Sequence, residues 1–302
     1  MRKSYIVISH IQIQNANAMS SCYTIGFPAM TAWLGAVHAW QRLLNRVPGL
    51  EQLVCVKTAV ISHQCQLQVY KEGRFKIQGT ANPLKRNKKT GNFERPPFIE
   101  EARIHLDVSL VVEVSGLSSD TDECCKTNLQ TILLTTKLAS GDVVSYQDMD
   151  IYYITEEDTT TERKILRRLM PGYALIERSD LLLAAANSQE DMLESLLDYL
   201  SIHVYGEADE AANTIEWQQQ KREPGWLVPI AIGFKGISPL GHVEMQRDAA
   251  KEHCFVESVV TLGEFKMTYR FQHVEDMMWH YVYDAMHQWY LCKNEAGGMN
   301  HG

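Results

Sequence analysis

The chain has 302 residues with 45% hydrophobic and 22% charged content, ordinary values for a globular protein with a sizeable core. No apolar run approaches the roughly 20 residues that a membrane helix requires, so we expect no membrane partner. The seven cysteines are scattered and form no CxxC pair, which favours reduced thiols in a cytoplasmic protein over a disulfide framework or a zinc site. The net charge of −8 argues against a generic nucleic-acid binder.

The first half of the chain opens with a strand pattern followed by a helix pattern. Residues 3–14 alternate apolar and polar side chains and are rich in β-branched residues, which predicts a strand. The stretch 12–42 then passes through a polar loop marked by Gly26 and enters an amphipathic helix over residues 33–44. A strand end that feeds a loop and a helix N-terminus can present amides and backbone N–H groups to a ligand.

The segments after the first helix, up to residue 154, complete a βαββαβ order of strands and helices. Residues 53–70, 102–114 and 142–154 predict strands, and residues 122–138 predict a helix. The resulting order βαββαβ predicts an α+β fold with a ferredoxin-like, RNA-recognition-motif-like palm over residues 1–155. We expect residues 71–100 to protrude from this palm as a β-hairpin, or thumb, because a structureless loop of that length would be unusual.

The second half, residues 156–302, predicts a mixed α/β region packed on the palm. Residues 162–169 and 188–199 have helical patterns, whereas residues 226–233 and 255–271 have extended patterns. Residues 206–225 are acidic and then glutamine-rich, which indicates a surface excursion. Residues 274–292 are rich in Met, Trp and Tyr, and we expect them to form an amphipathic helix.

Basic residues are concentrated in the predicted thumb. Residues 71–95 contain eight basic and two acidic side chains, so this segment has a charge of +6 and the rest of the chain −14. A charge run is often only a solvated loop, but Phe75 and Phe93 interleave with these cations. Lysines and arginines in such a segment release counterions from a phosphate backbone, and aromatic rings stack on unpaired bases. We therefore expect the thumb to contact nucleic acid.

Two other nucleic-acid motifs are weaker. The third strand reads ARIHLDVSLVVEV and lacks the aromatic run by which recognition motifs stack bases, so loops and the thumb are expected to bind instead. Gly233-Phe234-Lys235-Gly236 resembles a GxxG backbone clamp after a strand. An ordinary turn explains this tetrapeptide equally well.

The sequence contains no enzyme motif. It has no GxSxG, Walker loop, GxGxxG or HExxH, and we expect no catalytic residue, cofactor or metal. His280, Asp284 and His287 would share one side of the last helix, where packing or an interface is the simpler explanation than a metal site. A metal-free ribonuclease could pair a histidine with a tyrosine, but no motif fixes such a pair.

Several stretches together resemble one protein family. They are QIQNANAMSSCYTIGFPAMTAWLGAVHAWQR at 12–42, NPLKR at 82–86, EEARIHLDVSLVVEV at 100–114, GFKGISPLG at 233–241, Arg247-Asp248, FVES at 255–258 and Trp279-His280-Tyr281. In order over nearly the whole chain, they are similar to the Cas-five-type subunit of the type I-F CRISPR surveillance complex, the second subunit of the Csy complex.

The resemblance implies a RAMP-superfamily protein that is not an enzyme. Such a subunit would cap the 5′ handle of the CRISPR RNA together with the large subunit, abut a backbone subunit, and lie near target DNA beside the PAM. We call the first of these stretches, residues 12–42, the first block. Residues expected to contact RNA are Gln12, Gln14, Asn15, Asn17, Gly26, Phe27, His38, Gln41 and Arg42 in the first block, Lys76, Asn82, Lys85, Arg86, Lys88 and Lys89 in the thumb, and Gly233, Lys235 and Arg247 in the second half.

Two alternatives stay open at this point. A metal-independent endoribonuclease that processes CRISPR repeat RNA would belong to the same superfamily. A protein-only scaffold would use the acidic faces of the chain to recruit basic partners.

Overall fold

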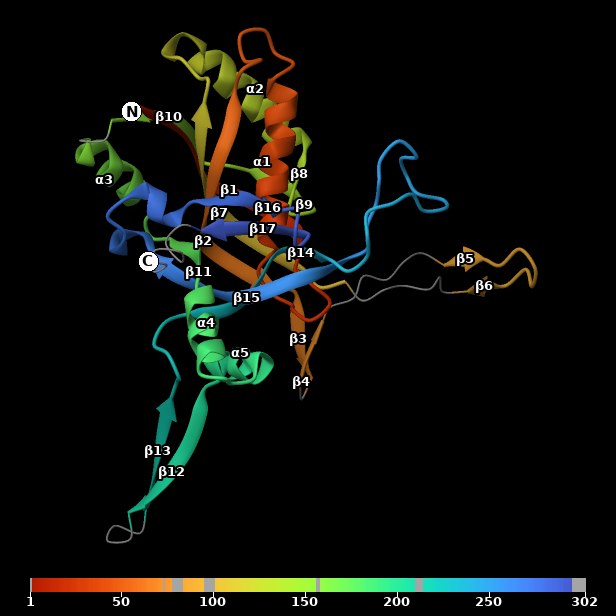
Figure 1. The fold of residues 1–302 in the computed structure, drawn as a ribbon, viewed down its shortest axis with the longest axis vertical. Helices are drawn as coiled ribbons and strands as arrows, with labels where there is room; N and C mark the ends of the chain where they lie inside the picture. Colours follow the sequence, from red (N-terminus) through yellow and green to blue (C-terminus); the bar gives the residue numbers. More distant parts are fainter. Residues whose placement is uncertain are drawn as a thin grey trace.

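A computed structural model describes residues 2–72, 74–77, 84–94, 101–155, 158–209 and 214–294 (Figure 1). Most of its strands join one large antiparallel sheet, in the order β11-β15-β14-β17-β16-β2-β7-β1-β9-β8, with β10 also paired to β1. The protein is therefore α+β, with both halves of the chain in the same sheet. Among the described residues, no helix combines the length and apolarity required to cross a membrane.

The first half supplies the central strands of the sheet. Its elements are β1 (Lys3–Asn17), α1 (Met30–Leu44), β2 (Val54–Leu67), β3 (Val69–Glu72), β4 (Arg74–Ile77), β5 (Lys85–Arg86), β6 (Phe93–Glu94), β7 (Arg103–Ser115), the 3-10 helix η1 (Ser119–Thr121), α2 (Asp122–Thr135), β8 (Lys137–Leu138), β9 (Gly141–Ser145) and β10 (Asp148–Ile154). Strand β7 lies between β2 and β1, and β9 and β10 pair with successive parts of the other edge of β1.

The second half extends this sheet and adds short helices. Its elements are α3 (Thr159–Arg168), β11 (Tyr173–Glu177), α4 (Ser179–Asn187), α5 (Met192–Leu200), β12 (His203–Asp209), β13 (Thr214–Gln220), β14 (Leu227–Gly236), β15 (Val256–Met267), the 3-10 helices η2 (Thr268–Arg270) and η3 (Val274–Met277), β16 (Trp279–Asp284) and β17 (Trp289–Asn294). Strand β2 pairs with both β11 and β16, so it joins the two halves.

Helix α1 packs between the two parts of the sheet. Its buried residues Met30, Trp33, Leu34, Val37, Trp40 and Leu44 recur at helical spacing. It contacts β2 on the palm side and β14, β16 and β17 of the second half. One core cluster includes Ile8 and Ile13 of β1, Trp33 of α1, and Ile230 and Trp279 of the second half. Burying α1 therefore requires strands from both ends of the chain.

The opposite face of the palm sheet is covered only at one end. Val7 of β1, Ile61 of β2 and Val111 of β7 form a second core with Leu166 of α3 and Met277 of η3. Because side chains alternate along a strand, this face is distinct from the one that packs on α1. The far end of the same face, where β1 and β2 continue past this core, has exposed residues.

The expected helix over residues 274–292 is wrong. This segment is a short 3-10 helix followed by the hairpin β16–β17, in which Tyr281 pairs with Cys292 and Tyr283 with Tyr290. Its aromatic residues at 279, 281 and 283 recur with period two, which suits a strand in which alternate side chains share a face. Trp279 is fully buried, and its indole N–H donates to the Leu175 carbonyl oxygen at 2.7 Å.

Three hairpins project from the sheet. β3 pairs with β4 and β5 with β6 within the basic segment, while β12 and β13 form a longer two-stranded arm beside α4 and α5 (Figure 1). The described part of the acidic, glutamine-rich stretch up to Gln220 is thus paired in two regular strands, and helix α4 was absent from the predicted elements. Cross-strand pairing places Val204 and Gly206 beside Gln219 and Trp217, and the Trp217 side chain is 68% exposed.

An ion-pair cluster fastens the second half to the palm. Glu275 of η3 accepts hydrogen bonds from Lys3 of β1 and from Lys57 of β2, the latter at 2.8 Å. These two ammonium groups lower the pKa of Glu275 to about 2, from an ordinary value of 4.5. Because the pKa is depressed in the folded state, the contribution to stability is present above about pH 4.5 and is lost as the pH falls through about 2.

We expect Glu275→Gln to reduce the free energy of unfolding at pH 7 by about 1 kcal/mol, a value discounted for the partial exposure of the ion pair. The difference from wild type should shrink as the pH falls from 4.5 towards 2, as measured by urea denaturation across this range. Glu252→Gln, at an exposed position in the 237–255 loop, is the control and should change stability by less than about 0.5 kcal/mol. A constant difference at all pH values would contradict the electrostatic origin of the effect.

Candidate functional site

The uncovered end of the palm sheet forms a polar surface, which we call the polar palm face. Residues paired across neighbouring strands share a face, and here Gln12 of β1 pairs with Asp107 of β7, which also pairs with Gln64 of β2. One step further along, His105 pairs with Gln66. By alternation Gln14 joins Gln12. The polar palm face thus comprises Gln12, Gln14, Gln64, Gln66, His105 and Asp107, and the four glutamines are exposed.

Two β-bulges aim two histidines onto this face. The pairing register of β1 with β7 shifts between Ile8 and Ile11, and that of β2 with β7 shifts between Ser62 and Gln64. The extra residues are His10 and His63, and His10 has the left-handed backbone conformation, with φ of 52°. Bulges re-aim side chains and are over-represented at functional sites, and a positive φ at a residue other than glycine is uncommon.

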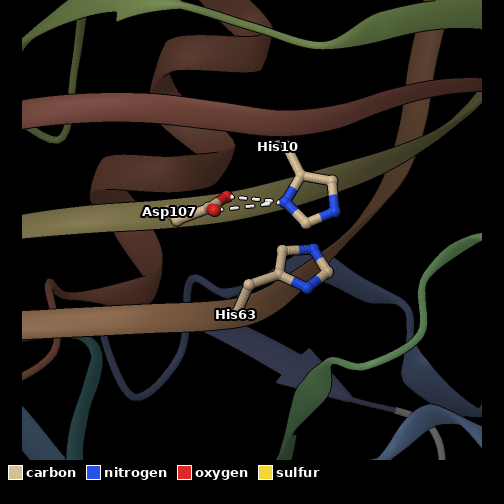
Figure 2. A group of neighbouring side chains, drawn as sticks. All are labelled: His10, His63 and Asp107. Carbon is tan, nitrogen blue, oxygen red and sulfur yellow. Dashed lines mark hydrogen bonds and ion pairs between the residues drawn. The ribbon is translucent and has the colours of Figure 1, made fainter.

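The two imidazoles meet beside a carboxylate at the border of the polar palm face. Their ring centroids are 4.0 Å apart with an interplanar angle of 25°, so His10 stacks on His63. Nδ1 of His10 lies 3.1 Å from both carboxylate oxygens of Asp107 (Figure 2). Asp107 projects from the strand that lies between those of the two histidines.

Hydrogen bonds fix how His63 is oriented. Its Nδ1–H donates to the Pro171 carbonyl oxygen at 2.7 Å, since a carbonyl can only accept. Its Nε2 therefore accepts from the buried Ser109 hydroxyl at 2.6 Å, and the Ser109 oxygen in turn accepts from the backbone N–H of His10 at 3.1 Å. Burial lowers the pKa of His63, which favours the neutral imidazole.

The polar residues of the first block lie beside this surface. Asn15 has φ of 56°, and its N–H donates to Nδ1 of His105 at 3.1 Å. Arg103 is paired with Asn17, whose side chain forms hydrogen bonds with both backbone groups of Met19. The strand therefore ends in a fixed turn that holds exposed amides next to Arg103 and His105.

Other residues of the first block have structural positions. Phe27 was expected to contact RNA, but it lies in the core, where it is 8% exposed and stacks on Trp33. Its ring is therefore not on the surface. The Gln41 side-chain oxygen accepts from the Cys55 N–H at 2.8 Å, and the Gly26 N–H donates to the Ala18 carbonyl oxygen at 2.8 Å.

His38 and Arg42 are exposed one turn apart on α1. They present a cationic side chain and an imidazole on the same side of the helix, because residues four positions apart are neighbours there. The structure therefore leaves these two residues of the first block available for contact, unlike Phe27.

The thumb cations are exposed on a short hairpin. Lys85 and Arg86 form β5, and Lys88 and Lys89 lie in the turn that leads to β6. The Arg86 Nε–H donates to the Gly91 carbonyl oxygen at 3.2 Å. This hydrogen bond stabilises the turn and does not neutralise the guanidinium charge. Lys76 is exposed on β4, whereas Asn82 lies outside the described residues.

The GxxG tetrapeptide is part of a strand and not a loop. Gly233, Lys235 and Gly236 belong to β14, which pairs there with β15 and β17. A Cβ at position 233 would lie 2.1 Å from the Tyr290 carbonyl oxygen, so glycine permits the close approach of β17. Lys235 is exposed and its ammonium lies 4.8 Å from the centroid of the Trp289 ring.

Arg247 is separate from these residues. It is exposed in the loop over residues 237–255, which joins β14 to β15. That loop has its own internal hydrogen bonds, with the Gln246 side-chain amide donating to the Asp248 and Lys251 carbonyl oxygens.

Comparison with known proteins identifies the family to which this chain belongs. The profile of the family described as CRISPR-associated protein (Cas_Csy2) matches residues 6–292, nearly the whole chain. The chain belongs to the Csy2 family. It is 30% identical to CRISPR-associated protein Csy2 of Pseudomonas aeruginosa (strain UCBPP-PA14) over 307 residues, which cover 92% of this chain and 91% of that protein. Membership of the Csy2 family makes the chain a subunit of the type I-F CRISPR surveillance complex.

Sequence reasoning missed part of the polar palm face in this Csy2-family chain. Gln64, Gln66 and His105 lie in segments that were correctly predicted as strands, and their alternation with apolar residues would have placed them on one face. The convergence of His10, His63 and Asp107 depends on two bulges, which alternation does not reveal.

We expect Gly233→Ala to lower the free energy of unfolding by about 2 kcal/mol, because the added methyl group forces β14 away from β17. Urea denaturation measures this loss. Gly241→Ala is a matched control, since nothing lies within 4 Å of a Cβ at that position. If Gly233→Ala left stability unchanged but weakened RNA binding, the glycine would act as a backbone clamp and not as a packing residue.

Proposed function

We propose that this subunit is a non-catalytic CRISPR RNA-binding protein that caps the 5′ handle of the guide RNA in the type I-F surveillance complex. The observation that supports the proposal is the continuity of the polar palm face with the basic hairpins. Strand β2 carries Gln64 and Gln66 on that face and, after Gln68, continues as β3. A polar surface for bases and riboses is thus joined along one strand to a source of positive charge.

The chemistry of the two parts fits single-stranded RNA. Glutamine and histidine side chains both donate and accept hydrogen bonds, as base edges and 2′-hydroxyls require. Exposed lysines on the β5–β6 hairpin can neutralise phosphates. The polar palm face has amides in place of the aromatic platform of common recognition motifs, so we expect recognition by hydrogen bonds rather than by stacking.

We further propose that residues 1–155 form a ferredoxin-like palm of the RAMP type, with residues 71–100 as its thumb. In support, the strand order β2-β7-β1-β10 places the first and third strands of the βαββαβ sequence in the centre and the second and fourth outside. The residues after 155 add strands to one edge of that sheet and cover part of one face.

The proposed partners follow from the surface charges. The basic hairpins would approach the guide backbone and target DNA near the PAM, while the remaining, acidic surface would contact the large subunit and a backbone subunit. Base pairing between guide and target would supply sequence specificity, with protein holding the backbones. The same assignment places the subunit in the cytoplasm, where the guide RNA and invading DNA meet.

A charge-neutralised thumb tests RNA binding. In the full-length chain, alone and assembled with the other subunits, Lys85→Gln, Lys88→Gln and Lys89→Gln combined should weaken binding of the guide RNA at low salt by more than about ten-fold and reduce the slope of log K against log salt by about 2. Fluorescence anisotropy at several salt concentrations measures both quantities. Arg86 is retained because it stabilises the turn.

A matched control removes three exposed lysines elsewhere, Lys137→Gln, Lys164→Gln and Lys251→Gln, with the same change in net charge. It should leave the salt slope near that of wild type. An unchanged slope in the thumb variant, with unchanged affinity, would favour the protein-only scaffold.

The metal-independent endoribonuclease is the second candidate, and the contact of His10 with Asp107 favours it. A carboxylate that orients an imidazole is a common arrangement for a general base. Incubation of the purified chain with labelled CRISPR repeat RNA in EDTA separates the two functions. We expect no specific cleavage, whereas cleavage that is abolished by His10→Ala would overturn the non-catalytic proposal.

A further inference from the structure

The cluster of His10, His63 and Asp107 depends on irregular and strained backbone in two strands. Two separate strands have a bulge at the same level of β7, and each bulged residue is a histidine. His10 also adopts a left-handed backbone conformation, which is unfavourable at a residue other than glycine. Such strain persists where the surrounding structure enforces it, and it is a reason to ask what the convergence serves.

The three side chains offer two imidazole nitrogens and a carboxylate. We propose that His10, His63 and Asp107 bind one late first-row divalent metal ion such as Zn²⁺. One donor atom from each residue lies within 4.8 Å of the others. Zinc sites with two histidines, one carboxylate and a water or ligand in the fourth position are common, and mixed nitrogen and oxygen ligation favours such ions over Mg²⁺ and Ca²⁺, which prefer oxygen alone.

The spacing of His10 and Asp107 needs only a small adjustment to accept an ion. Nδ1 of His10 and the carboxylate oxygens of Asp107 are separated by 3.1 Å. Two ligands at ordinary zinc distances, about 2.0–2.1 Å from the metal, lie about 3.3 Å apart in a tetrahedral site. The pair is therefore close to the spacing of two adjacent ligands, and the ion would take the place of the Nδ1 proton, which is released to solvent.

His63 would supply the third donor atom through its Nε2. Its Nδ1–H donates to the Pro171 carbonyl oxygen, the kind of outer contact that orients metal-binding histidines and leaves Nε2 as the ligand. On binding, Nε2 would exchange its hydrogen bond from Ser109 for the metal. A Cβ at Gly172 would lie 2.8 Å from Cε1 of His63, so the glycine in this turn gives the ring space to lie beneath it.

The position of the cluster determines what the ion could add. Asp107 belongs to the polar palm face, and the His10 and Asp107 side chains retain 29% and 16% exposure. A fourth ligand, such as water or a phosphate oxygen, could reach the metal from that side. The ion would place positive charge on a surface where the described side chains are mostly neutral amides.

Metal titration of the intact chain tests the site. Metal-free full-length protein, kept reduced and titrated with Zn²⁺ by calorimetry, should bind one equivalent that is lost, or weakened by more than about ten-fold, in both His10→Ala and Asp107→Asn. Cobalt substitution gives a second readout, because a four-coordinate Co²⁺ site has intense visible d–d bands that the variants should abolish.

Matched controls separate this site from other donors. His105→Ala alters a neighbouring histidine outside the cluster, and Cys65→Ser removes an exposed thiol on the same strand as His63. Both should retain the stoichiometric ion and the cobalt bands. Unfolding curves identify any variant that fails to fold, and Asp107→Asn serves where His10→Ala is unstable. Absence of stoichiometric binding to wild type, or equal binding by the folded variants, would overturn the proposal, whether or not RNA binding is confirmed.

Discussion

Elements from both halves of the chain cover helix α1, and the architecture depends on this shared cover. Its tryptophans and leucines share a core with β1, β2 and α2 of the first half, while the hairpin β16–β17 and strand β14 cover the side that faces the second half. At Gly35, a Cβ would be only 3.7 Å from the Tyr281 hydroxyl, which shows how closely the hairpin approaches the helix. The second half of the chain therefore shares one core with the first half and is not a separately packed module.

The same attachment determines which part of the palm stays available. Helix α3, strand β11 and η3 bury one end of the sheet face opposite α1, and Glu275 holds η3 to β1 and β2. The other end of that face is left with amides, histidines and Asp107, next to the start of the basic hairpins. If bases stacked on the open face of this sheet, the end covered by α3, β11 and η3 would not be available to them. Here the polar end and the hairpins are the parts of the described surface to which the proposed RNA contact is assigned.

How far the sequence predicts this structure depends on the range of the interactions involved. Strands β1, β2 and β7 and helix α1 follow from local alternation and helical spacing, because each buries a regular face. The last hairpin was mistaken for a helix, since runs of Met, Trp and Tyr fit either period when they are short. The bulges at His10 and His63 were not predictable, because they depend on Ser109, which is 99 and 46 residues away. The sequence thus indicated Gln12, Gln14 and the charge of the basic segment, but not Gln64, Gln66 or the meeting of His10 with His63.

The pairing of Trp279 with Thr58 has a consequence for how the chain matures. The indole packs in part against β11 and α1, and the strand that carries it follows both of them in the chain. Until that strand has been synthesised, the apolar side of α1 that faces the second half has no native cover. Contacts with such large sequence separation slow folding and prolong the lifetime of intermediates that expose hydrophobic surface and tend to aggregate. The core around α1 therefore cannot close until the second half of the chain has been synthesised.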